Sequence, residues 1–170
     1  MKYGYVHRFG KNTGGIRQVM LTPACNIKSS SIDPDTGHFL SIALHDPEKL
    51  AEYTFAENAV RYREEFDYPN GIPSVTHILE FKTDKIDEES DRLIRQLAAL
   101  SCCGLAAVIT TNNQTRLLVG YSEEHLAERP LKLSKIAADS GYKHTDPGHE
   151  AISLISRDTA KAGIFCGNIG

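Results

Sequence analysis

Residues Ser74 to Gly104 indicate the fold class most clearly, and their sequence is SVTHILEFKTDKIDEESDRLIRQLAALSCCG. Its first ten residues alternate between two faces, and one face carries Val75, His77, Leu79 and Phe81. A period of two predicts a β-strand from Ser74 to Thr83. In the remainder, apolar residues recur at helical spacing, namely Leu93, Ile94, Leu97 and Leu100. We therefore expect a helix that begins near Asp84 to Glu89 and that Gly104 stops.

Other segments extend this alternation of strand and helix. Leu105 to Thr110 and Thr115 to Tyr121 flank Asn112-Asn113 and predict a hairpin. Asp46-Pro47-Glu48 is typical of a helix start, and the helix is expected to run to about Arg63. Further expected elements are helical turns over Leu131 to Ala138 and strands over Ala151 to Ile155 and Ala162 to Cys166.

Together these elements predict an α+β protein. We expect residues 1–170 to form a single domain, with a mixed or antiparallel, split β core flanked by helices. Residues 84–147 are expected to form an inserted helix-hairpin-helix subregion.

Composition narrows the classes of function. The 170 residues include 41% hydrophobic and 24% charged residues and carry a net charge of -3, without a Lys/Arg block. That pattern argues against extended nucleic-acid binding, which requires a concentrated basic face. No apolar run is long enough to cross a bilayer, and the polar segment Met1 to Arg17 lacks the apolar stretch of a secretory signal. We expect a cytoplasmic protein that does not bind a membrane.

The cysteines and histidines give no metal-binding pattern. Cys25, Cys102, Cys103 and Cys166 lack zinc spacing, and we interpret them as reduced, small hydrophobic residues. His144 and His149 flank a turn with Asp146, which we interpret as solvated rather than metal-binding. The common signatures of phosphate loops, nucleophile elbows and dinucleotide folds are absent from the sequence.

An ordered series of segments carries the functional hypothesis. It consists of Tyr5 to Gly10, with His7 and Arg8; Gly37 to Ser41; the predicted helix from Asp46; the strand Val75 to Phe81; and Glu150 to Ile155. This series resembles the ADP-ribosyltransferase family, whose split β core presents an Arg or His, then a Ser-containing strand before a helix, then a Glu at the start of a late strand. The resemblance covers about half of the chain.

The resemblance implies an enzyme that consumes NAD and modifies a macromolecular target, as a bacterial or phage effector does. Glu150 is then the catalytic carboxylate, which stabilises positive charge on the ribose as nicotinamide leaves. Arg8 or His7 holds the dinucleotide, Ser41 orients Glu150, and Tyr53 or Phe55 stacks on the nicotinamide ring. Gly148, two positions before Glu150, departs from the pattern of arginine-directed members.

Two alternatives remain open. The first is a non-catalytic binding or inhibitor protein that contacts a protein partner through the acidic segment Asp84 to Asp91 with Glu123, Glu124 and Glu128. The second is a small-molecule enzyme or a ligand-sequestering protein that acts on another nucleotide, in a cleft lined by the loop Tyr142 to Glu150.

Overall fold

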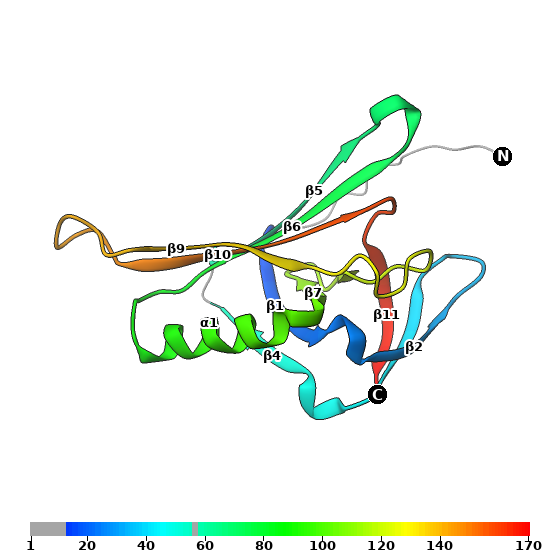
Figure 1. Cartoon of the computed structure of the whole chain (residues 1–170), viewed down its shortest axis with the longest axis horizontal. Coiled ribbons are helices and arrows are strands. Elements are labelled where there is room, and N and C mark those ends of the chain that lie inside the picture. The colour runs from blue at the N-terminus through cyan, green and yellow to red at the C-terminus, as the bar shows by residue number, and fades with distance from the viewer. Residues whose placement is uncertain (1–12, 56–57) are drawn as a thin grey trace.

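A computed structural model describes residues 13–55 and 58–170 of the chain, and within them two β-sheets form the body of the protein (Figure 1). The seven-stranded sheet has the order β2-β3-β11-β8-β7-β1-β4, and the four-stranded sheet has the order β5-β6-β10-β9. A search of the described residues found no helix long and apolar enough to cross a membrane.

The strands of the seven-stranded sheet come from both ends of the chain. They are β1 (Ile16–Pro23), β2 (Ile27–Ile32), β3 (Phe39–Leu44), β4 (Ala51–Thr54), β7 (Leu105–Thr111), β8 (Arg116–Val119) and β11 (Gly163–Ile169). Their pairings are antiparallel except that β11 lies parallel to β3. The last strand of the chain therefore joins the β2-β3 hairpin to the rest of the sheet.

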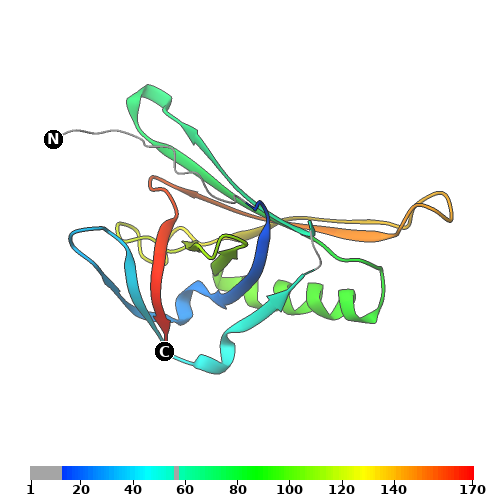
Figure 2. The same cartoon turned by 180° about the vertical axis from the view of Figure 1, so that it is seen from behind.

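The four-stranded sheet is antiparallel and consists of two hairpins. β5 (Val60–Asp67) pairs with β6 (Ser74–Lys82), β6 with β10 (His149–Asp158), and β10 with β9 (Lys132–Asp139). Figures 1 and 2 show that both hairpins project beyond the body of the molecule. The 3₁₀ turn η3 (Pro69–Gly71) lies between β5 and β6.

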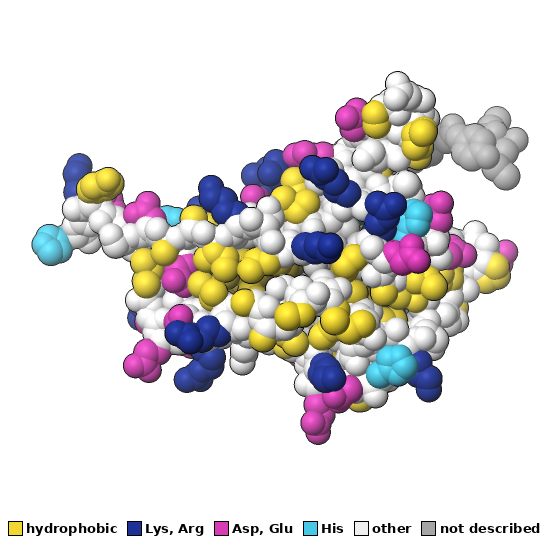
Figure 3. Space-filling model, viewed as in Figure 1, with side chains coloured by type: hydrophobic (Ala, Val, Ile, Leu, Met, Phe, Trp, Pro, Cys, Tyr) yellow, Lys and Arg dark blue, Asp and Glu magenta, His cyan; other side chains and the backbone are white. Residues whose placement is uncertain are grey.

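Helix α1 (Glu88–Leu100) follows β6 and begins with a strong local signal. The Asp87 side chain accepts hydrogen bonds from the backbone amides of Glu89 and Ser90, and the Ser90 hydroxyl receives one from the Asp87 amide. This capping box satisfies amides that otherwise lack a partner at a helix start. Leu97 of α1 is fully buried in a core that also contains Val19 of the seven-stranded sheet and Leu154 of the four-stranded sheet. In Figure 3, hydrophobic side chains gather along the line where β10 lies over α1.

Short 3₁₀ turns connect several of the elements. They are η1 (Ala24–Asn26), after β1; η2 (Pro47–Lys49), before β4; and η4 (Ser101–Cys103), after α1. Gly104 follows η4 with a φ of 74°, a left-handed conformation that favours glycine.

Several expectations are confirmed. The strand over Ser74 to Thr83, the helix that follows it and the hairpin over Leu105 to Tyr121 are present as β6, α1, β7 and β8. The closing strands are β10 and β11. The β core with a helix against it agrees with the predicted α+β class, but strands dominate the structure more than expected.

The prediction of a helix from Asp46 to Arg63 is wrong. Asp46 does accept a hydrogen bond from the Glu48 amide, but the helix ends after one 3₁₀ turn, and β4 and β5 follow. β4 pairs with β1 and β5 pairs with β6, so both segments gain ladders of backbone hydrogen bonds. Pairing with distant strands overrides weak helical spacing.

The helical turns expected over Leu131 to Ala138 are likewise strand β9, because this segment pairs with β10. Residues 84–147 therefore contribute β7 and β8 to one sheet and β9 to the other. The four cysteines are free thiols, but all of them are exposed. The free thiols agree with the interpretation of the cysteines as reduced residues, but their exposure does not agree with a role as small hydrophobic residues of the core.

Candidate functional site

A cleft of about 460 Å³ lies between β4, the segment that joins β6 to α1, and α1 itself. A volume of this size is in the range of sites for small ligands. The residues that line it are Tyr53, Thr54, Phe55, Lys82, Thr83, Asp84, Lys85, Asp87, Glu89, Ser90, Arg92, Leu93 and Gln96. We call it the β4-α1 cleft.

One wall of the β4-α1 cleft is aromatic. The rings of Tyr53 and Phe55 stack with their centroids 6.3 Å apart, and Phe55 packs on the buried Phe81 ring at 5.2 Å. A planar ligand can extend such a stack.

The hydroxyl of Tyr53 is buried and has no hydrogen-bond partner among the described residues. Burial raises the pKa of the Tyr53 phenol, so the hydroxyl stays protonated at neutral pH. A buried polar atom without a partner costs free energy, and a ligand that supplies the partner recovers it.

The opposite wall is the first half of α1, and the rim is charged. Lys82, Lys85 and Arg92 line the cleft together with Asp84, Asp87 and Glu89. Asp87 is already engaged as the helix cap. The rim therefore offers cations that can contact phosphate or carboxylate groups, with acidic side chains between them.

Glu150 lies immediately beside this cleft at the start of β10. Its amide donates to the Thr83 hydroxyl at 3.0 Å, and its carbonyl accepts from the Thr83 amide at 2.9 Å. Only 8% of Glu150 is exposed, and its Oε2 has no hydrogen-bond partner within residues 13–55 and 58–170. It points to the same face of β10 as the buried Ile152 and Leu154. A second unpaired oxygen therefore lies next to a residue that lines the cleft.

The structure brings some of the predicted site residues together and separates others. Tyr53 and Phe55 line the cleft, and Glu150 pairs with the cleft residue Thr83. Ser41 is exposed on β3, near the opposite edge of the seven-stranded sheet from β4, so it is not the residue that orients Glu150. His7 and Arg8 lie outside the described residues.

Comparisons with models of protein families, with curated protein sequences and with solved structures found no match. The function must therefore be inferred from the geometry of the site. In the part of the chain that the structure describes, no group of three or more His, Cys, Asp or Glu side chains is arranged to hold a metal ion.

Sequence reasoning missed the residues that α1 and its N-terminal connection supply, above all Thr83, Lys85 and Arg92. The available signal was the junction of a predicted strand and a predicted helix, because such junctions place polar side chains at one edge of a sheet. The acidic segment Asp84 to Asp91 partly serves the helix itself: Asp87 caps it, and Asp91 pairs with Arg95 at 2.7 Å.

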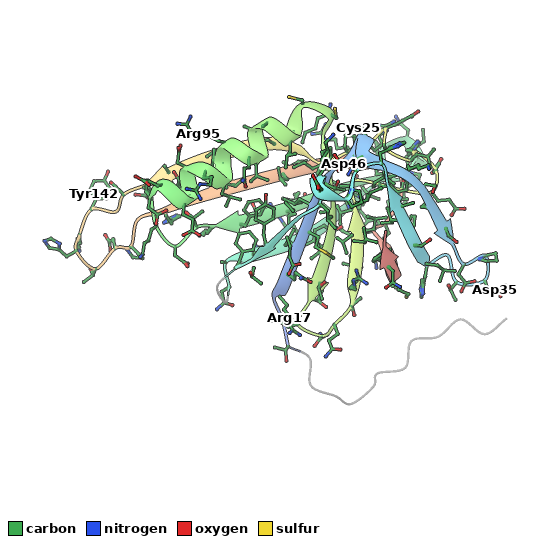
Figure 4. The ribbon with its side chains drawn as sticks, turned by 90° about the horizontal axis from the view of Figure 1, so that it is seen from below. Arg17, Cys25, Asp35, Asp46, Arg95 and Tyr142 are labelled. Atoms are coloured by element: carbon green, nitrogen blue, oxygen red, sulfur yellow. The ribbon has the colours of Figure 1, made fainter. Side chains whose placement is uncertain are left out.

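The loop Tyr142 to Glu150 begins in the tip that joins β9 to β10 and ends on β10. Tyr142 in this tip is fully exposed and lies at the far end of the projecting hairpin (Figure 4). The residues that line the β4-α1 cleft come from other elements.

Proposed function

We propose that the protein binds a nucleotide in the β4-α1 cleft through a planar, hydrogen-bonding head group, and that the nucleotide is NAD. The observation that carries this proposal is the buried Tyr53 Oη in the wall of an aromatic cleft of about 460 Å³, together with Glu150 Oε2 on the residue that pairs with Thr83 of the cleft. Neither oxygen has a hydrogen-bond partner among the described residues. Native proteins leave few such atoms unsatisfied, and those that remain often mark a site of function.

The chemistry of the cleft fits the parts of NAD. Nicotinamide is planar and can stack on the ring pair Tyr53 and Phe55. Its carboxamide, or a ribose hydroxyl, can donate a hydrogen bond to the free oxygen of the Glu150 carboxylate. Lys85 and Arg92 on the rim supply positive charge for a diphosphate. The resemblance to ADP-ribosyltransferases favours NAD over other nucleotides.

Transfer of ADP-ribose is the reaction that this assignment implies. The bond between nicotinamide and ribose breaks, nicotinamide leaves with the bonding electrons, and an acceptor on a macromolecule forms the new bond to the sugar. A carboxylate close to the ribose stabilises the positive charge that develops before the acceptor attacks. Glu150 is the residue proposed for this role.

Calorimetric titration of the full chain with NAD, ADP-ribose and nicotinamide tests binding. We expect NAD to bind and Tyr53→Phe to weaken its affinity about fivefold, because the variant loses one hydrogen bond to the ligand. Tyr68→Phe is the matched control, since Tyr68 is 63% exposed at the β5-β6 turn and its loss should leave affinity unchanged. An absence of heat with all three compounds would refute NAD as the ligand.

Release of nicotinamide from NAD in the presence of a cell lysate tests the reaction. Glu150→Gln keeps the shape of the side chain and removes its charge, so we expect it to retain NAD binding and to lose nicotinamide release. Binding by the wild type without release in any lysate would leave a binding protein and refute the transferase role.

A second function, contact with a protein partner, is favoured by a different observation. Three apolar side chains near the β5-β6 turn are strongly exposed: Phe66 by 50%, Tyr68 by 63% and Ile72 by 64%. Clustered exposed apolar residues are typical of interaction surfaces. If this surface binds a protein, the double variant Phe66→Ser, Ile72→Ser should lose the partner in a pull-down, while its unfolding temperature stays unchanged. Equal recovery of the partner by the wild type and the double variant would exclude this surface.

A further inference from the structure

The antiparallel ladder between β1 and β7 continues toward two cysteines. Thr22 lies opposite Ala106 and Pro23 opposite Leu105. The Ala24 amide then donates to the Gly104 carbonyl at 2.9 Å, so the two chains remain adjacent one position further. Cys25 directly follows Ala24 in turn η1, and Cys103 directly precedes Gly104 at the end of turn η4. Two thiols on adjacent turns can form a disulfide when their Cβ atoms face each other.

Both thiols are accessible. Cys25 and Cys103 are exposed, and they line a pocket of about 430 Å³ that also includes Lys49, Leu100 and Cys102. The pocket lies at the C-terminal end of α1, and Figure 4 shows Cys25 beside that end of the helix. A small oxidant can therefore reach the pair from solvent.

The two thiols also interact with each other. A hydrogen bond with Cys25 is the main cause that raises the pKa of the Cys103 thiol, and the nearby Lys49 acts in the opposite direction. The raised pKa keeps Cys103 protonated at neutral pH, so its reaction with oxidants should accelerate as the pH rises and the thiolate forms.

We propose that Cys25 and Cys103 form a reversible disulfide in response to hydrogen peroxide. One sulfur, as thiolate, attacks a peroxide oxygen; the O–O bond breaks, and a sulfenic acid and one water form after proton transfer. The second thiol then attacks the sulfenic sulfur, the S–S bond forms and a second water leaves. Two electrons pass from the thiols to the peroxide, and a dithiol reductant reverses the change.

The bond has a defined structural consequence. It joins η1, at the end of β1, to η4, at the end of α1, and closes the chain between Cys25 and Cys103. A closed loop of this length restricts the unfolded chain strongly. The oxidised protein should therefore unfold at a temperature roughly 10 °C higher than the reduced protein.

Peroxide treatment of the full reduced chain, followed by thiol titration and peptide mapping, tests the proposal. The chain has four cysteines, and we expect two reactive thiols to disappear. Trypsin should yield a disulfide between peptides 18–28 and 96–116. Because Cys102 and Cys103 share the second peptide, the Cys102→Ser variant assigns the partner.

The four Cys→Ser variants should differ in two measurements, the disulfide cross-link and the rise in unfolding temperature on oxidation. Cys102→Ser and Cys166→Ser should keep both the cross-link and the thermal shift, and Cys25→Ser and Cys103→Ser should lose both. Loss of the cross-link in Cys102→Ser would show that Cys102, and not Cys103, forms the disulfide, and would overturn the proposal. A disulfide only between two chains, or four thiols that remain reactive after oxidation, would also overturn it.

Discussion

At the scale of single residues, Tyr62 and Tyr53 form an informative contrast. The Tyr62 hydroxyl lies 2.8 Å from Glu64 Oε1 and 2.8 Å from His77 Nδ1. His77 is buried, and its Nε2 donates to the Ala160 carbonyl at 3.0 Å, since a carbonyl can only accept. Burial, and then the charge of Glu64, raises the pKa of Tyr62. Tyr53 has none of these partners within the described residues.

The contrast predicts opposite effects of the same substitution. Tyr62→Phe leaves Glu64 and His77 without the shared hydroxyl and should lower the free energy of unfolding by about 1–3 kcal/mol. Tyr53→Phe removes a hydroxyl that has no protein partner and should leave stability unchanged or slightly raised. Urea unfolding of both variants measures the difference. A loss of stability in Tyr53→Phe as large as in Tyr62→Phe would show that the Tyr53 hydroxyl has a protein partner after all.

At the scale of elements, strand β11 holds the seven-stranded sheet together. It pairs antiparallel with β8 and parallel with β3. Arg116 of β8 donates to the Gly167 carbonyl at 2.6 Å, and its guanidinium lies 4.5 Å from the centroid of the Phe165 ring. At Gly167 the backbone of β3 comes so close that an added Cβ would overlap the Leu40 carbonyl oxygen.

This close approach makes Gly167 irreplaceable in the sheet. Gly167→Ala must push β3 away from β11 and should lower the free energy of unfolding by about 3 kcal/mol. Gly14→Ala is the control, because a Cβ added to Gly14 would meet no atom of the described residues within 4 Å and the effect should stay within about 0.5 kcal/mol. Chemical unfolding measures both. Equal stabilities for the two variants would contradict the β3-β11 pairing.

At the scale of the whole molecule, the two sheets share one hydrophobic core. It contains Val19 and Ile109 of the seven-stranded sheet, Leu79 and Leu154 of the four-stranded sheet, and Leu97 of α1. Neither sheet can lose this contact without exposing apolar surface of the other. The sheets should therefore unfold together.

The prediction is a single unfolding transition in urea, with coincident curves from far-ultraviolet circular dichroism and tyrosine fluorescence. Leu97→Ala removes a side chain that both sheets contact through the core and should shift both curves equally, by about 2–5 kcal/mol in the free energy of unfolding. The conservative Leu97→Met should shift them much less. Two separate transitions would show that the sheets are independent folding units.

Elements with local signals could be predicted from the sequence. β6 follows from strict alternation, α1 from its Asp87 cap and apolar stripe, and the β7-β8 hairpin from two apolar runs around a turn. These signals act between residues a few positions apart, so they can be recognised without the fold. Glu150, Tyr53 and Phe55 were also identified as candidate residues, although from a resemblance whose predicted helix is absent.

The strands that follow Asp46 and Leu131 could not be predicted from the sequence, because their stability comes from hydrogen-bond ladders with β1, β6 and β10. The same holds for the β4-α1 cleft. One of its walls is β4 and the other is α1 with its N-terminal connection, and β5 and most of β6 separate these walls in the sequence. It holds also for the pocket that brings Cys25 and Cys103 together. Contacts between distant segments depend on register and packing, which no local pattern of residues encodes.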